Sequence, residues 1–225
     1  MTRYAISDIH GNLKALLEVL KKSKFDYNKD ELIIVGDIVD GYSDSYYVVE
    51  EILKIKNVKF IIGNHDVFWM SHMATGWAEK VWLIQGGLAT LESYKSQNYN
   101  YKKIPKSHKD FYNNGVYWYE VDNMLFVHGG FNYPTLPKDS DIYTLTWDRE
   151  LFYRCMGGLK IKEWNKVFIG HTATEDSKPC IMDNVPGAKV INIDCGAGWK
   201  GRLCLYDIDT DKYFLSKQFK GHDKY

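Results

Sequence analysis

Residues 32–42 read LIIVGDIVDGY, an apolar run that ends at Gly36 and is followed at once by the carboxylates of Asp37 and Asp40. Four consecutive leucine or β-branched side chains predict a strand that is buried on both faces, and a glycine after it lets the backbone turn tightly. Asp37 is therefore expected at the lip of a sheet, which is where open α/β sheets bind their ligands. An aspartate that caps a helix has the same local sequence, so the rest of the chain has to decide.

The size and charge of the chain exclude several classes of protein. Its 225 residues can bury enough surface to fold without disulfides, and we interpret 1–225 as one domain. Lysine plus arginine balance aspartate plus glutamate at 29 each, so no overall field would attract nucleic acid or a membrane surface. The N-terminus lacks the apolar segment of a signal peptide, and no run of about 18 apolar residues occurs. These features predict a soluble, cytoplasmic protein.

The cysteines form no C-x-x-C pair, and two of them lie in strand-like stretches where cysteine behaves as a small apolar residue. We expect free, buried thiols in a reducing compartment. The residues concerned are Cys155, Cys180, Cys195 and Cys204.

The first third of the chain alternates between predicted strands and predicted helices. A short strand over 4–7 precedes a helix whose apolar stripe is Leu13, Leu16, Leu17 and Leu20, at helical spacing. Ser43 or Asp44 can cap a second helix, with Val48, Ile52 and Ile55 on its apolar side, and a strand over 60–62 follows. Such alternation favours parallel strands joined by crossover helices.

The later part of the chain has short strands with short links, which predicts antiparallel or mixed pairing. The turn residues 209–211 suggest a hairpin, and the polar stretch 93–109 is expected to be an exposed loop. Together the patterns predict an α/β fold of two packed mixed sheets with helices on the outside. The later strands are expected at 124–127, 166–169, 189–194, 203–208 and 212–216.

Polar side chains that can bind metal follow five of the apolar runs, always at the same end. Taken singly, each has a structural explanation as a helix cap or a turn residue. Five repetitions weaken that explanation, because the carboxyl ends of parallel strands lie together and would bring these side chains into one pocket. The residues are, in chain order, Asp8 and His10, Asp37, Asn64 with His65 and Asp66, His128, and His171.

The mixture of oxygen and imidazole donors suits Mn²⁺, Fe, Co²⁺ or Zn²⁺, whereas the lack of thiolate spacing argues against a structural zinc site. One ion does not need so many ligands. Two ions about 3.5–4 Å apart, bridged by one carboxylate, would use them all and form a clamp for phosphoryl transfer.

These residues fall into five short motifs whose order and spacing are more specific than any one of them. They are D-x-H-G (Asp8, His10), G-D-x-V-D (Asp37, Asp40), G-N-H-[ED] (Asn64, His65, Asp66), H-[AG]-G (His128) and G-H-T (His171). The set resembles the calcineurin-like metallophosphoesterases, and more narrowly their phosphoprotein-phosphatase branch from bacteria and phages. The resemblance covers residues 3–208 and includes the stretches 82–94, 147–149 and 193–198. It implies a four-layer sandwich of two sheets and two helical layers.

The resemblance also implies a role for each motif residue. Asp8 and His10 would hold one metal ion, Asp37 would bridge, and Asn64, His128 and His171 would hold the second ion. Two Mn²⁺ ions are implied first, with Fe, Zn²⁺, Co²⁺ or Ni²⁺ as alternatives. His65 would be the general acid with Asp40 as its partner, since a histidine beside a carboxylate keeps its proton near neutral pH. Arg149 matches an arginine that grips phosphate oxygens, although a surface salt bridge would explain it as well.

The chain departs from the family pattern at Gly41 and Tyr42, where the family commonly has an arginine and a glycine. One arginine of the expected phosphate clamp is therefore missing. Lys80, Lys200 or Arg202 could replace it, but sequence alone does not place them.

The implied function is metal-dependent hydrolysis of phosphomonoesters, above all phosphoserine and phosphothreonine in proteins, by direct attack of a metal-bound hydroxide. A second hypothesis keeps the chemistry and changes the substrate to a nucleotide: a dinucleoside polyphosphate, a cyclic phosphate or an RNA end. A third hypothesis is a non-catalytic binding module, which the missing arginine favours and the complete ligand set opposes. No membrane partner is expected, and fold-level similarity cannot choose the substrate.

Overall fold

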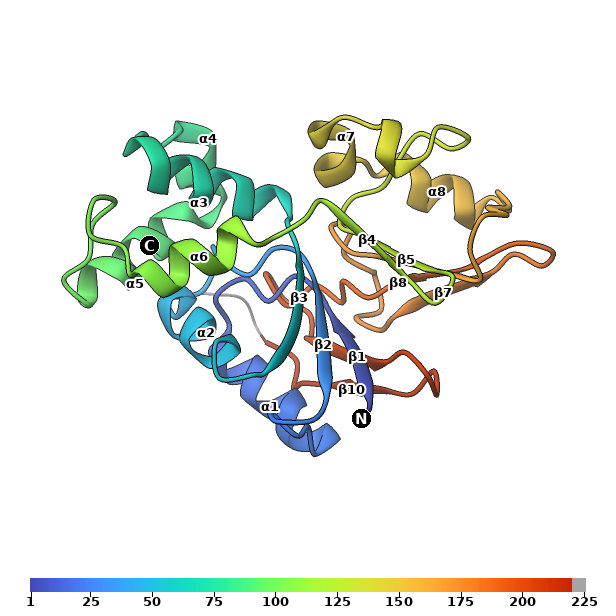
Figure 1. Cartoon of the computed structure of the whole chain (residues 1–225), viewed down its shortest axis with the longest axis horizontal. Coiled ribbons are helices and arrows are strands. Elements are labelled where there is room, and N and C mark those ends of the chain that lie inside the picture. The colour runs from blue at the N-terminus through green and yellow to red at the C-terminus, as the bar shows by residue number, and fades with distance from the viewer. Residues whose placement is uncertain (220–225) are drawn as a thin grey trace.

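The computed structural model describes residues 1–219 and contains two five-stranded sheets packed face to face (Figure 1). The first sheet has the order β10-β9-β1-β2-β3 and the second has the order β4-β5-β6-β8-β7. The strands of the first sheet are β1 (Arg3–Ile6), β2 (Glu31–Val35), β3 (Asn57–Ile61), β9 (Cys204–Asp207) and β10 (Tyr213–Leu215). Those of the second sheet are β4 (Trp118–Val121), β5 (Met124–Val127), β6 (Lys166–Ile169), β7 (Cys180–Asp183) and β8 (Lys189–Asn192).

Helices cover the outer face of each sheet. Those before β4 lie on the first sheet: α1 (Leu13–Ser23), α2 (Ser45–Ile52), α3 (Asn64–Thr75), α4 (Lys80–Trp82), η1 (Leu83–Gly87), α5 (Leu88–Ser96) and α6 (Lys106–Asn113). Those between β5 and β6 lie on the second sheet: η2 (Pro137–Asp139), α7 (Ile142–Trp147) and α8 (Glu150–Met156). No helix within residues 1–219 is long and apolar enough to span a membrane.

Strand pairing agrees with the predicted mixture of directions. β1, β2 and β3 are parallel, with α1 and α2 as crossover helices. In the second sheet β5, β6 and β8 are parallel, and the edge strands β4 and β7 run antiparallel to their neighbours. The turn at 209–211 joins β9 and β10 in the predicted hairpin.

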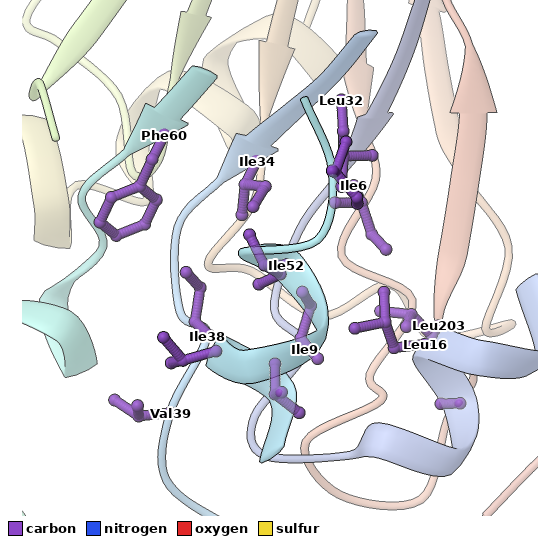
Figure 2. Close-up of a cluster of buried hydrophobic side chains, with 14 of the residues drawn as sticks. Ile6, Ile9, Leu16, Leu32, Ile34, Ile38, Val39, Ile52, Phe60 and Leu203 are labelled. Atoms are coloured by element: carbon purple, nitrogen blue, oxygen red, sulfur yellow. The ribbon is translucent and has the colours of Figure 1, made fainter. Parts of the chain in front are cut away.

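The strand that opens the sequence analysis is buried on both faces, as predicted. Ile34 of β2 joins an apolar cluster between the first sheet and its helices, where it lies near Ile6, Ile52 and Phe60 (Figure 2). Ile33 points the other way, into a cluster that fills the space between the two sheets. A third cluster lies between the second sheet and α7 and α8. Three apolar layers between four layers of secondary structure are the sandwich that the sequence predicts.

The apolar face of α1 differs from the predicted stripe. Leu17 is 42% exposed, whereas Ala15, Leu16, Val19 and Leu20 are buried. The buried face is thus turned about one residue from the leucine stripe, since the small side chains of Ala15 and Val19 let the helix pack closely against the sheet. The second helix is preceded by Asp44, whose side chain forms no capping hydrogen bond.

The prediction of an exposed loop over 93–109 is wrong at both ends. Residues 93–96 belong to α5 and residues 106–109 to α6, and only the segment between them is irregular. His108 is fully buried, because its Nδ1 lies 2.8 Å from the Tyr94 hydroxyl and its Nε2 lies 2.8 Å from a Glu50 carboxylate oxygen. These long-range polar contacts fold a polar stretch onto α2 and α5.

The cysteines are free, as expected. Three of them are buried, and Cys180 on the edge strand β7 is half-buried.

Candidate active site

The predicted metal ligands converge at the carboxyl ends of the parallel strands. Two groups of side chains bring ligand atoms within 4.8 Å of one another: His10, Asp37 and His65 form one group, and Asp37, His128 and His171 form the other. Asp37 belongs to both groups, in the position that a bridging carboxylate requires. The sheets therefore meet at this site, since His128 follows β5 and His171 follows β6.

At the site the backbone adopts conformations with positive φ, which residues other than glycine rarely adopt. Positive φ angles cost about 1–3 kcal/mol each and persist where the surrounding structure imposes them, most often at functional sites. Here they orient side chains toward a common point just after a strand. The site residues with positive φ are Asp8 (53°), His10 (49°), Asp37 (56°), Asp40 (73°) and His171 (65°).

Asp66 joins the two loops that carry the first-sheet ligands. Its carboxylate accepts hydrogen bonds from the backbone N–H groups of Asp37 (2.7 Å), Ile38 (3.1 Å) and Gly63 (3.0 Å). Asp37 in turn accepts a hydrogen bond from the backbone N–H of His65 at 2.9 Å. Sequence analysis placed Asp66 in a motif but gave it no role. Its position three residues after Gly63 is the capping-box signal that could have identified it.

Glycine is required where the chain passes closest to the ligands. A side chain at Gly36, whose φ is +86°, would collide with the His128 ring, and one at Gly63 would collide with the Asp37 carboxylate. The glycine that ends the run 32–36 thus serves both the turn and the approach of His128 from the second sheet.

Asp8 is buried and links the two sheets. Its carboxylate accepts hydrogen bonds from the Ser7 hydroxyl and from the backbone N–H of His171, the latter at 3.2 Å. Burial and the nearby carboxylate of Asp194 raise the pKa of Asp8 above its ordinary value. Asp194 follows β8 and is buried, so a sixth parallel strand also delivers a carboxylate to this edge. The stretch 193–198 was noted in the sequence, but Asp194 itself was missed.

Two imidazoles are oriented by backbone carbonyls. The Nδ1 atom of His10 lies 3.1 Å from the carbonyl oxygen of Val39, and that of His128 lies 2.8 Å from the carbonyl oxygen of Val35. A carbonyl can only accept, so each Nδ1 carries the hydrogen and each Nε2 faces the site, which is how proteins orient metal-binding histidines.

The ring charges differ between these histidines. Burial lowers the pKa of His10 to about 4, so its ring is neutral. Burial also disfavours a charge on His128, but the Asp37 carboxylate at 3.2 Å outweighs it and raises the pKa of His128 to about 10. Asp37 therefore favours the charged form of the His128 ring.

His171 has the clearest property of a ligand. Its Nε2 atom is buried and has no hydrogen-bond partner among the residues that the structure describes. Burial and the charge of His128 lower the pKa of His171 to about 3, which leaves a neutral ring with a free lone pair. The Asn64 side-chain oxygen lies 3.1 Å from Nε2 of His128 and so lies beside the second group. This donor set fits two divalent ions that share Asp37.

His65 and Asp40 form the predicted pair. Nδ1 of His65 lies 2.7 Å from Oδ2 of Asp40, and Asp40 is fully buried. The same carboxylate accepts hydrogen bonds from Trp82 Nε1 (2.7 Å) and Thr90 Oγ1 (2.6 Å). Burial lowers the pKa of His65, but Asp37 and Asp40 outweigh it and raise that pKa to about 9. Trp82 and Thr90 lie in the noted stretch 82–94, where sequence analysis gave them no role.

Arg149 lies beside the second group of ligands. Its Nη1 donates hydrogen bonds to the carbonyl oxygen of His171 (2.6 Å) and to Oγ1 of Thr172 (3.2 Å). The residue is therefore attached to the loop of a candidate ligand and is not part of a surface salt bridge among those the structure describes.

Gly41 stands at the position of the missing arginine and has a φ of +83°. Its backbone N–H donates to the carbonyl oxygen of Gly86 at 3.3 Å, so η1 packs against this turn. Among residues 1–219, no hydrogen bond or ion pair joins the side chain of Lys80, Lys200 or Arg202 to a predicted site residue. The structure thus brings together all nine predicted residues and identifies no replacement for the arginine.

Comparison with known proteins gives the same picture. Residues 1–192 match the family model described as calcineurin-like phosphoesterase. A relative from Buchnera aphidicola subsp. Baizongia pistaciae, named "Bis(5'-nucleosyl)-tetraphosphatase, symmetrical", is 25% identical over 96% of this chain and 98% of its own. A protein of the same name from Buchnera aphidicola subsp. Schizaphis graminum is 46% identical, but over only 30% of this chain and 25% of its own.

Solved structures share the fold. One described provisionally as a diadenosine tetraphosphatase has a TM-score of 0.70 and 19% identity, over 97% of this chain and 94% of its own. A protein serine/threonine phosphatase from Saccharomyces cerevisiae has a TM-score of 0.56 and 15% identity, over 100% of this chain and 81% of its own. At these identities the likeness shows the fold alone. The family model covers most of the chain, and the chain therefore belongs to the calcineurin-like phosphoesterase family.

Proposed function

We propose that this chain is a metal-dependent hydrolase of dinucleoside polyphosphates, with bis(5'-nucleosyl) tetraphosphates as its substrate class. The observation that carries the proposal is the pair of donor groups sharing Asp37, beside a histidine whose Nδ1 lies 2.7 Å from the buried Asp40 carboxylate. When bound there, two divalent ions supply positive charge for phosphoryl oxygens and an activated water molecule. The substrate class is supported by the relative that matches almost the whole chain and is named for the symmetrical cleavage of such compounds.

In this proposal Asp8, His10 and Asp37 hold one ion, and Asp37, Asn64, His128 and His171 hold the other. The unpartnered Nε2 of His171 and the mixture of oxygen and nitrogen donors support that division. Such a set suits Mn²⁺ and also accommodates Fe, Co²⁺, Ni²⁺ or Zn²⁺.

His65 donates the proton in this proposal. Its Nδ1 is held by Asp40, so Nε2 is the atom that faces a substrate, and the buried Asp40 carboxylate raises the pKa of His65 and favours the protonated ring. Proton donation to the oxygen that leaves with the nucleoside diphosphate removes the charge that develops there. Trp82 and Thr90 hold Asp40 in place and thus orient His65 through it.

Arg149 binds the substrate's phosphate oxygens in this proposal. Among residues 1–219, the hydrogen bonds of its side chain all come from Nη1, so the other N–H groups of the guanidinium remain for a phosphate. A planar guanidinium can bind two oxygens at once, which suits a chain of phosphates.

Hydrolysis of phosphoserine or phosphothreonine, the first expectation from the sequence, has weaker support. The yeast protein phosphatase shares the fold with 15% identity, and a shared fold does not indicate a substrate. The complete donor set and the named relatives also oppose a non-catalytic binding module.

The test is hydrolysis by the purified chain with Mn²⁺. Bis(5'-adenosyl) tetraphosphate, a phosphoserine peptide and p-nitrophenyl phosphate serve as substrates, with chromatography of the products. We expect kcat/KM for the dinucleotide to exceed that for the peptide at least about tenfold, with ADP as the only nucleotide product. A preference for the peptide would contradict the proposal, and ATP with AMP as products would contradict symmetrical cleavage.

A further inference from the structure

Two neighbouring aromatic rings lie on α7, next to the candidate active site: that of Tyr143 is exposed and that of Trp147 is half-buried. Tyr143 and Trp147 are one helical turn apart, with ring centroids 6.1 Å apart and ring planes inclined by 19°. Tyr143 is 72% exposed. One face of its ring lies toward Trp147, so the opposite face is open to solvent. Packing within the chain does not explain why so large a ring is presented in this way.

The pair is connected to the site through Trp147. The Trp147 ring meets the ring of His171 edge to face at 5.7 Å, and it meets the ring of Phe68 in the same manner at 5.9 Å. Phe68 in turn lies 6.5 Å from the ring of His65. Trp147 thus contacts His171 directly and is separated from His65 by Phe68, and Tyr143 lies one ring farther out.

Hydrogen bonds fix the position of α7, the helix that carries Tyr143. Asp141 caps α7 by accepting hydrogen bonds from the backbone N–H of Thr144 (2.9 Å) and from its hydroxyl (2.8 Å). The carbonyl oxygen of Leu145 accepts a hydrogen bond at 2.8 Å from the backbone N–H of Gly129, which follows the ligand His128. The helix that carries the rings is therefore attached to the metal-ligand loop.

We propose that the open face of Tyr143 is the stacking platform for one base of the nucleotide substrate. The inference rests on the proposed function for the identity of the substrate. In a dinucleoside tetraphosphate cleaved symmetrically, a diphosphate and a ribose separate each base from the reacting bond. A base at that distance from the reacting bond would lie beyond Trp147, whose ring contacts His171. Tyr143 is the next ring beyond Trp147. A phosphotyrosine ring, attached directly to its phosphate, would meet Trp147 first.

Stacking on an aromatic side chain tolerates any base, because every base presents a π-face. The platform therefore selects nucleotides over simple phosphates without selecting adenine over guanine. It acts on affinity for the substrate and not on the chemical step, since Tyr143 lies outside the groups that bind metal or carry the proton.

The experiment measures binding of ADP, the expected product, to the Mn²⁺-loaded protein by calorimetry. Tyr143→Ala should weaken ADP binding about tenfold, which is the lower part of the range for loss of one stacked base. Tyr143→Phe should keep ADP binding, and neither variant should change the binding of pyrophosphate or phosphotyrosine. Tyr153→Ala is the matched control, because Tyr153 lies on α8, is 59% exposed and, within the described residues, has its ring contact with Phe152 alone.

Unchanged ADP binding in Tyr143→Ala would overturn the platform, and so would an equal loss of pyrophosphate or phosphotyrosine binding. The proposed function is tested separately, by turnover of the dinucleotide in the unaltered protein. If that turnover is absent while Tyr143→Ala still loses ADP binding selectively, the function fails and the platform stands. Because Tyr143 is exposed, the alanine variant is expected to fold, and its pyrophosphate binding checks that the site is intact.

Discussion

The two walls of the site are built in different ways. The acid wall lies on the side of the first sheet and is formed by the half-buried His65 and the buried residues Asp40, Trp82 and Thr90. Its Asp40 carboxylate accepts hydrogen bonds from two neighbours and also contacts His65. The substrate wall, formed by His171, Arg149, Trp147 and Tyr143 on the side of the second sheet, has an unpartnered imidazole nitrogen and an exposed ring.

The difference shows which part of the site is complete by itself. A proton donor needs a fixed orientation, and the acid wall provides it because Asp40 holds Nδ1 of His65 and is itself held by Trp82 and Thr90. Binding of metal ions and substrate requires groups that are available to a ligand. The substrate wall provides the unpartnered Nε2 of His171 and the exposed ring of Tyr143. The following experiments test this division, beginning with the largest effect.

Metal removal should abolish turnover while leaving the fold intact, because Asp66 joins the ligand loops through three backbone N–H groups without an ion. Protein stripped with a chelator and reloaded with Mn²⁺ should contain about two ions per chain. His171→Ala should lower that number to about one. Metal analysis and circular dichroism are the measurements. Full activity at one ion per chain, or unfolding on chelation, would contradict the distinction between the acid wall and the substrate wall.

His65→Asn should keep both ions and lower kcat by on the order of 10²–10⁴, the usual contribution of a positioned general acid. The loss should be smaller for p-nitrophenyl phosphate than for an alkyl phosphate, because a better leaving group needs less protonation. The variant also tests whether His65 is a metal ligand, since His65 lies in one of the two metal-donor groups. Loss of an ion, or equal losses for the two substrates, would make His65 a ligand and not the acid.

Trp82→Phe should destabilise the protein more than Trp69→Phe, by about 1.5–3 kcal/mol, the worth of a buried hydrogen bond to a charged group. Both indoles are 1% exposed, but only that of Trp82 donates to Asp40, whereas Nε1 of Trp69 has no hydrogen-bond partner in the part of the chain that the structure describes. The two substitutions remove the same atoms, so the difference between their urea unfolding free energies isolates the bond. Equal losses would show that the acid wall does not depend on it.

Gly41→Arg should add a phosphate-binding charge next to the acid wall, so that the substrate wall is no longer alone in binding the phosphate. Relative to Gly41→Ala, it should raise the monoester-to-diester ratio of kcat/KM about fivefold, which corresponds to roughly 1 kcal/mol for a partly exposed charge interaction. Alanine is the matched control because both variants share the strain of a φ near +83°. A ratio that is the same in both would mean that the missing arginine does not set substrate preference.

The sequence predicted the parts of this site that depend on local chain geometry. Apolar runs followed by polar residues identify where a strand ends, and parallel pairing then brings the ends together, so Asp8, Asp37 and His171 could be predicted without coordinates. The resemblance supplied the division of labour between His65 and Asp40, and their 2.7 Å contact agrees with it.

The parts that escaped prediction depend on contacts between distant residues. Trp82 and Thr90 are 42 and 50 positions from Asp40, and no local pattern indicates that their donors point at one carboxylate. The burial of His108 has the same cause, since its partner Glu50 lies 58 positions away. The rotation of α1 followed from packing against the sheet, which the leucine spacing alone does not contain.

The layer between the sheets has a mechanical consequence. Asp8 and Asp37 extend from the first sheet and His128 and His171 from the second, so the thickness of that layer sets the distance across the site. The stacked rings of Phe126 and Phe168, 4.8 Å apart in β5 and β6, lie within the layer. Close-packed interiors transmit strain, so a change of side-chain volume there shifts one set of ligands against the other. The thickness of the inter-sheet layer therefore sets the separation between the two sets of side chains, and residues that never touch the site can change that separation.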